Sequence, residues 1–108
     1  MTGFQRGVLY WARLDKRRPV LVVSSNIIHR SWSYLSVVPG STRLRPLPTH
    51  VRLARGEGGL RTATMLLCEH VQTIAKADVE AHPIGSSLSP ERMHEVETAL
   101  LLLFDMRL

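Results

Sequence analysis

The arginines in the first part of the chain are the residues whose type and spacing point most directly to chemistry. Residues 1–61 contain ten arginines and one lysine but only two acidic residues, whereas residues 62–108 contain three basic and seven acidic ones. A guanidinium makes planar, forked contacts to phosphate that a lysine ammonium cannot make. This distribution indicates a surface that binds nucleic acid or another polyanion, and the alternative is a solubilising basic face.

Five histidines and one cysteine are the other side chains that could do chemistry. A histidine can act as a general acid or base near neutral pH. No two of the five are spaced like metal ligands on a helix, so we expect no metal site and no cofactor. Cys68 lies in an apolar segment and is expected to pack there. A single cysteine, without a signal-peptide or membrane-spanning pattern, fits a cytoplasmic protein.

The elements that must position these residues are short strands. Alternating or β-branched apolar runs predict strands at residues 7–14, 19–24, 34–39, 49–53, 62–68 and 70–74. Polar residues 15–18 predict a tight turn between the first two strands. Residues 25–30 suffice for one helical turn, capped by Ser25 or Asn26. A second single turn is expected within residues 76–81, and a loop or short strand at 84–87.

One helix follows the strands. Ser89, Pro90 and Glu91 supply a cap, a favoured first helical residue and an acidic first turn. Apolar residues then recur at three- to four-residue spacing, at Met93, Val96, Leu100, Leu103 and Phe104. The strands are too closely spaced for βαβ units. The sequence therefore predicts a mostly β (α+β) domain over residues 1–108, a small antiparallel barrel with a C-terminal helix.

Five motifs, in this order along the chain, resemble the MazF/PemK-type toxins of bacterial toxin–antitoxin pairs. They are RG…YW…LD at residues 6–15, RPVLVVS at 18–24, VVP…PLPTHV at 37–51, LCEHVQTI at 67–74, and the segment from 84 into the terminal helix. The resemblance covers nearly the whole chain. It implies a homodimeric, SH3-like barrel of the MazF/PemK/CcdB class, which cleaves single-stranded RNA without a metal and binds a cognate antitoxin.

The resemblance also implies which residues form the site. Arg18, just before Pro19, corresponds to an arginine that clamps the scissile phosphate. Ser41 or, after a one-residue shift, Thr42 corresponds to a hydroxyl that contacts this phosphate. His70 replaces a frequent glutamine and adds a possible general acid or base. RNA contacts are expected from Lys16, Arg17, Arg43, Arg45, His50, Arg52 and Glu69. Strand alternation over residues 49–53 turns His50 outward, where it is either structural or RNA-facing. The plainer alternatives are exposed turn residues and a solvated basic rim.

The chain also departs from the family pattern. Only Lys16 and Arg17 separate the LD and RP motifs, where many relatives carry a long loop over the substrate. Val8, Gly40 and Gln72 replace an acidic residue, an aliphatic residue and a frequent arginine. Two other functions therefore stay open. One is a non-catalytic toxin of the same barrel class that acts on DNA gyrase through its C-terminal helix, and the other is a nucleic-acid-binding relative with weak catalysis.

Overall fold

The computed structural model of the chain describes residues 3–107. Its elements in chain order are β1 (Leu9–Arg13), β2 (Arg17–Val22), α1 (Asn26–His29), β3 (Tyr34–Ser41), β4 (His50–Leu53), η1 (Glu57–Gly59), β5 (Thr64–Leu67), η2 (Cys68–His70), β6 (Gln72–Ala75), η3 (Lys76–Asp78), β7 (Val79–Pro83) and α2 (Pro90–Phe104), where η denotes a short 3-10 helix. No helix in these residues is long and apolar enough to cross a membrane.

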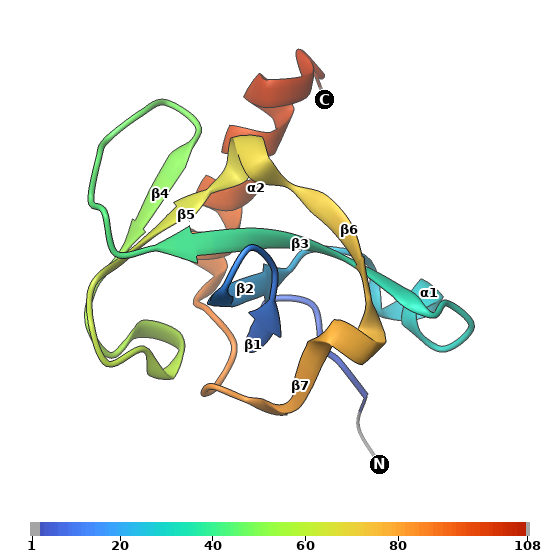
Figure 1. Cartoon of the computed structure of the whole chain (residues 1–108). Helices are drawn as coiled ribbons and strands as arrows, with labels where there is room; N and C mark the ends of the chain where they lie inside the picture. Colours follow the sequence, from blue (N-terminus) through green and yellow to red (C-terminus); the bar gives the residue numbers. More distant parts are fainter. Residues whose placement is uncertain (1–2, 108) are drawn as a thin grey trace.

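The strands form one strongly curved antiparallel sheet. Its order is β4-β5-β3-β2-β1-β7, and β6 also pairs with β3. The long strand β3 joins the two parts of the sheet, because residues 34–37 pair with β6 whereas Gly40 and Ser41 pair with β5. Figure 1 shows β3 crossing the middle of the molecule, with α2 behind it. The predicted fold class is confirmed, but the barrel is open, since β4 and β7 end the sheet and have no pairing between them.

Apolar side chains cover both faces of the first hairpin. Leu9 and Leu21 point into a core that also contains Val96 and Ala99 of α2. Their neighbours Tyr10 and Val20 point the other way, into a second core with residues of β3 and β7. Successive strand residues face opposite sides of a sheet, so the uninterrupted apolar sequence of these strands follows from burial on both faces.

The hairpin between β1 and β2 is tighter than the sequence indicates. Arg13 pairs with Arg17, and the Leu14 N–H donates to the Lys16 carbonyl at 3.0 Å, so the connection is residues 14–16. The prediction that β2 begins at Pro19 is wrong, because Arg17 and Arg18 find backbone partners in β1. Hydrogen-bonded pairing, rather than side-chain polarity, decides where this strand begins.

The other strands and helices lie close to the predicted ranges, with three additions. These are η1, β7 and η2, which takes Cys68–His70 from the ends of the predicted strands 62–68 and 70–74. The single turns at α1 and η3 are present, and the Ser25 side chain caps α1 by accepting the Ile27 N–H. Strand β7 was not predicted, because only Val79 of its residues is buried and the segment lacks an apolar pattern. It forms by pairing with the edge of β1.

Helix α2 begins as predicted, with Ser89 accepting the Arg92 N–H. It packs against β4 and η2 through a face that includes the buried Val96 and Ala99. Phe104, expected in the apolar stripe, is instead exposed, as are Leu102 and Met106. The last turn of the helix extends beyond the sheet that covers the rest of it (Figure 1).

Candidate functional site

The tight hairpin fixes Arg18 through the carboxylate of Asp15. Arg18 Nε donates to Asp15 Oδ1 at 2.8 Å, and Nη2 donates to Oδ2 at 3.0 Å. These hydrogen bonds from Arg18 lower the pKa of Asp15 to about 2, and the same contact raises the pKa of Arg18. The Arg18 side chain is 24% exposed, so one edge of a permanently charged guanidinium is held while the group stays accessible.

Two hollows meet at Arg18, whose side chain lines both. The larger hollow, of about 700 Å³, is also lined by Lys16, Arg17, Ser41 and Thr42. The smaller hollow, of about 330 Å³, is lined by Leu14, Asp15, Arg18, Pro39, Leu67, His70 and Gln72. The structure therefore brings Arg18 together with both candidate hydroxyls on one side and with His70 on the other.

The two candidate hydroxyls lie at the end of β3. Ser41 is the last residue of the strand, and its Oγ accepts the Arg43 N–H at 3.1 Å, which leaves the hydroxyl hydrogen free to donate. Thr42 follows as an exposed residue of the same wall. Either hydroxyl can donate to an anion held by Arg18.

Gly40 sets the close approach of β3 to β2 at this site. A Cβ atom there would stand 2.7 Å from Thr64 Cγ2 and 3.2 Å from Pro19 Cγ. The departure from the aliphatic residue of the family is thus matched to its neighbours. Gly40 packs against Pro19, which follows Arg18, and it precedes Ser41 in β3. Its lack of a side chain therefore sets how closely the strand that carries Ser41 approaches the strand that carries Arg18.

His70 lies exposed at the end of η2, with its side chain 62% accessible. Its Nε2 is 3.9 Å from Glu69 Oε2, beyond hydrogen-bonding distance. The ring is therefore free of a strong protein partner and faces the smaller hollow.

His50 does not face outward as expected. Its side chain is 5% exposed, and its Nε2 lies 2.7 Å from Glu69 Oε2 while its Nδ1 lies 2.6 Å from the Arg45 carbonyl oxygen. Thr49 Oγ1 donates to the other Glu69 oxygen. Burial opposes ionisation of Glu69, but the hydrogen bonds from His50 and Thr49 outweigh it and lower the pKa of Glu69. Together these side chains tie the connection 42–49 to η2.

The predicted RNA-binding cations divide into two groups. Lys16 and Arg17 line the larger hollow, although Arg17 is also held by Glu80 through two hydrogen bonds and stacks over Trp11 at 4.3 Å. The other predicted cations are exposed and line neither hollow; they are Arg43 and Arg45 on the connection 42–49 and Arg52 on β4. The structure brings the first group to Arg18 and leaves the second outside the hollows.

Three residues of the site were missed by the sequence analysis. Arg61 and His82 line the larger hollow, and they come from segments that share no motif with Arg18. Asp15 was placed in the LD motif and in a turn, but it was given no role in the site. Its spacing of three residues from Arg18, across a short connection, is a signal that could have identified it.

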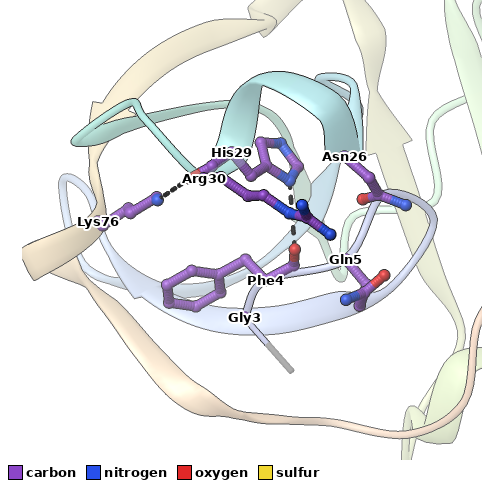
Figure 2. A pocket seen from close by; sticks show the side chains of 7 residues that line it. All are labelled: Gly3, Phe4, Gln5, Asn26, His29, Arg30 and Lys76. Atoms are coloured by element: carbon purple, nitrogen blue, oxygen red, sulfur yellow. Dashed lines mark hydrogen bonds between the residues drawn. The ribbon is translucent and has the colours of Figure 1, made fainter. Parts of the chain in front are cut away.

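A third hollow, of about 690 Å³, lies at α1 and is shown in Figure 2. The buried His29 bonds the Phe4 carbonyl oxygen through Nδ1 and Ser24 Oγ through Nε2, and Lys76 donates to the His29 carbonyl. The ring and the ammonium are engaged within the fold (Figure 2), and this hollow contains none of the predicted site residues.

The described residues, 3–107, contain neither a cluster of metal ligands nor a reactive thiol. No group of three or more His, Cys, Asp or Glu side chains lies together there in a way that could hold a metal ion. Cys68 is buried in the core, and burial raises the pKa of its thiol to about 12. The thiol is thus protonated at neutral pH and packs as an apolar group, as expected.

Three comparisons place this geometry among known proteins. Residues 5–104 match the family described as PemK-like, MazF-like toxins of type II toxin–antitoxin systems. The chain is 31% identical over 71 residues to the endoribonuclease MazF3 of Mycobacterium tuberculosis, a match that covers 66% of this chain and 68% of the relative.

Solved structures agree with the sequence match. The Mycobacterium tuberculosis toxin MazF-mt6 is 28% identical, with a TM-score of 0.85 over 94% of this chain and 99% of that one. A mycobacterial endoribonuclease solved in complex with its cognate antitoxin is 24% identical, with a TM-score of 0.85 over 97% and 98% of the two chains. The second likeness is one of fold alone.

Proposed function

We propose that the chain, which belongs to the PemK-like, MazF-like family of type II toxins, is a metal-independent endoribonuclease. Its proposed activity is the cleavage of single-stranded RNA at selected sequences. The observation that carries this proposal is the position of Arg18 between two hollows, with hydroxyls lining one and His70 the other. The relative named as an endoribonuclease favours RNA cleavage over action on DNA gyrase.

The proposed reaction begins when a ribose 2′-hydroxyl attacks the adjacent phosphorus. The O2′–P bond forms as the P–O5′ bond breaks, and the products are a 2′,3′-cyclic phosphate and a 5′-hydroxyl. Arg18 stabilises the charge that builds on the phosphoryl oxygens, and Ser41 or Thr42 donates a hydrogen bond to one of them. His70 takes the proton from the 2′-hydroxyl and returns one to the 5′-oxygen, because an arginine is a poor proton acceptor.

The other basic residues extend the path of the RNA backbone away from Arg18 in this proposal. Lys16 and Arg17 contact the phosphates beside the cleaved one, and Arg43, Arg45 and Arg52 contact more distant ones. His50 and Glu69 are hydrogen-bonded to each other. Their proposed role in RNA binding is indirect, because they hold the connection that carries Arg43 and Arg45.

The proposed partners follow from charge and from the family. An acidic cognate antitoxin complements the basic first part of the chain, and a mycobacterial relative has been solved with its own antitoxin. The family resemblance implies a homodimer. The proposed RNA substrate and the single, unreactive cysteine are both in keeping with a cytoplasmic protein.

Cleavage of a long single-stranded RNA in EDTA tests the proposal. The wild-type protein should give discrete cuts with 2′,3′-cyclic phosphate and 5′-hydroxyl ends. Arg18→Ala should lose at least roughly 100-fold in rate, as expected when a group that stabilises transition-state charge is removed. Arg13→Ala is the matched control, because Arg13 lies in the same hairpin, pairs with Asp78 and lines neither hollow.

Two results would contradict this assignment. Intact RNA at high wild-type concentration would exclude the activity itself. Equal cutting by wild type and Arg18→Ala would keep the activity but place it away from Arg18.

A further inference from the structure

We propose that Asp15 is a positioning residue for Arg18, which holds one edge of the guanidinium and turns the other edge toward the RNA phosphate. The inference rests on the proposed function, since it assigns Arg18 the phosphate. It concerns a residue of the shortened hairpin that belongs to the LD motif but received no role in the predicted site.

The contact between the two side chains uses one edge of the guanidinium only. Asp15 accepts from Nε and from one N–H of Nη2. The remaining N–H groups of Nη1 and Nη2 form the outer fork, the edge that binds phosphate bidentately. Within residues 3–107, no other acceptor is hydrogen-bonded to the Arg18 guanidinium, so this fork is available to a ligand.

The position of Asp15 indicates that it orients the Arg18 guanidinium and does not block the RNA phosphate from reaching it. Asp15 lines the smaller hollow beside Arg18 and His70, but it does not line the larger one. The side of Arg18 that faces Ser41 and Thr42 is therefore free of the carboxylate. A phosphate held by the outer fork can accept from these hydroxyls without displacing Asp15.

The short hairpin is the reason that the contact exists. With only residues 14–16 between the paired Arg13 and Arg17, Asp15 lies at the tip of the turn and reaches back to Arg18. A flexible arginine would have to lose side-chain entropy each time it bound phosphate, and a carboxylate that already fixes its plane removes that cost. Asp15 thus supplies, within the protein, the alignment of Arg18.

Steady-state kinetics of Asp15→Asn test the proposal. The substrate is a short RNA that contains a cut site mapped with the wild type, and a 2′-deoxy analogue at that site reports binding without cleavage. Asparagine is favoured in turns and keeps the side-chain shape, but it lacks the charge and the second acceptor oxygen. We expect kcat to fall roughly 10- to 100-fold, while KM and the affinity for the analogue change less than about 3-fold.

Two further variants separate positioning from a general effect. Asp78→Asn is the matched control, since Asp78 pairs with Arg13 of the same hairpin and lines neither hollow, and its kcat should stay that of the wild type. Asp15→Glu keeps the carboxylate and should recover most of kcat. Asp15 is 67% exposed, so all three variants should melt near the wild-type temperature.

The opposite outcome has a distinct signature. If Asp15 instead competed with RNA for Arg18, Asp15→Asn would lower KM and raise kcat/KM, and this would overturn the proposal. An unchanged kcat would overturn it as well.

A spectroscopic readout separates failure of this inference from failure of the proposed function. The Nε–H resonance of Arg18, assigned by its loss in Arg18→Lys, should exchange slowly in the wild type and quickly in Asp15→Asn. If the wild-type protein leaves RNA intact, the proposed function fails. An Arg18 signal that is the same in both proteins shows independently that Asp15 does not hold the guanidinium.

Discussion

Two neighbouring arginines, Arg17 and Arg18, have different partners although they share a strand. Successive strand residues point to opposite sides, so Arg17 reaches Glu80 of β7 and the ring of Trp11, whereas Arg18 reaches Asp15 of its own turn. The first contact ties β7 to the sheet, and the second leaves an edge of the guanidinium free. The role of an arginine here depends on which acceptor lies within its reach.

His70 provides a prediction at this scale. His70→Gln places at this position the residue that many relatives have, with similar size and hydrogen-bonding capacity but no proton to exchange. We expect kcat to fall roughly 100-fold, the range typical for loss of a general acid or base, with little change in KM.

His82→Gln is the matched control for this variant. His82 lines the larger hollow, away from His70, and the mechanism gives it no proton transfer. If His70→Gln cleaved RNA at the wild-type rate, proton transfer would have to come from another group.

At the scale of elements, the site depends on how β3 meets β2 and β5. Ser41 ends the strand that pairs with β5, and Pro39 pairs with Val20 of β2. Gly40 lies between Pro39 and Ser41 in β3, and it packs against Thr64 of β5. The distance between the hydroxyls and Arg18 is thus set by strand packing rather than by a flexible loop.

Gly40→Ala tests this packing. The added Cβ would meet Thr64 Cγ2 at 2.7 Å, so the strands must shift, at a cost of about 1–3 kcal/mol in the free energy of unfolding. Thr64→Ser removes the Cγ2 atom, and the double variant should be more stable than the sum of the single effects predicts. Urea unfolding of the four proteins measures this coupling, and strict additivity would show that the two residues do not meet.

At the scale of the whole molecule, charge is separated along the chain. The first 61 residues hold eleven of the fourteen basic residues, and the remainder, which includes α2, is acidic on balance. The fold places Arg43 and Arg45 on the long connection beside β4, and this connection is anchored by His50 rather than free. RNA that enters the larger hollow is expected to continue toward these cations.

Salt dependence of binding tests this path. The logarithm of the binding constant for the uncleavable 2′-deoxy oligonucleotide should fall linearly with the logarithm of the salt concentration. The reason is that phosphates release their counterions when they pair with the protein's basic side chains. The double variant Arg43→Ala with Arg45→Ala should reduce the slope by about 1.4, because each lost phosphate contact on a single strand contributes roughly 0.7. Arg107→Ala, an exposed change at the other end of the chain, should leave the slope unaltered; equal slopes in all three proteins would place the RNA elsewhere.

The sequence by itself determined the element types and the identity of the central residues. Apolar alternation marked most strands, and Ser89 with Pro90 marked the start of α2, because caps and periodicity depend on neighbouring residues. The motif around Arg18 pointed to the residue on which both hollows converge. These features are local, and a local pattern is recorded in consecutive residues.

The tertiary structure decided the features that depend on distant partners. It turned His50 inward onto Glu69, extended β2 to Arg17, formed β7 from an exposed segment and left the barrel open. It also brought Arg61 and His82 to the hollow that Ser41 lines. Each of these outcomes follows from strand pairing or from a hydrogen bond between residues far apart in the chain, which no periodicity in the sequence encodes.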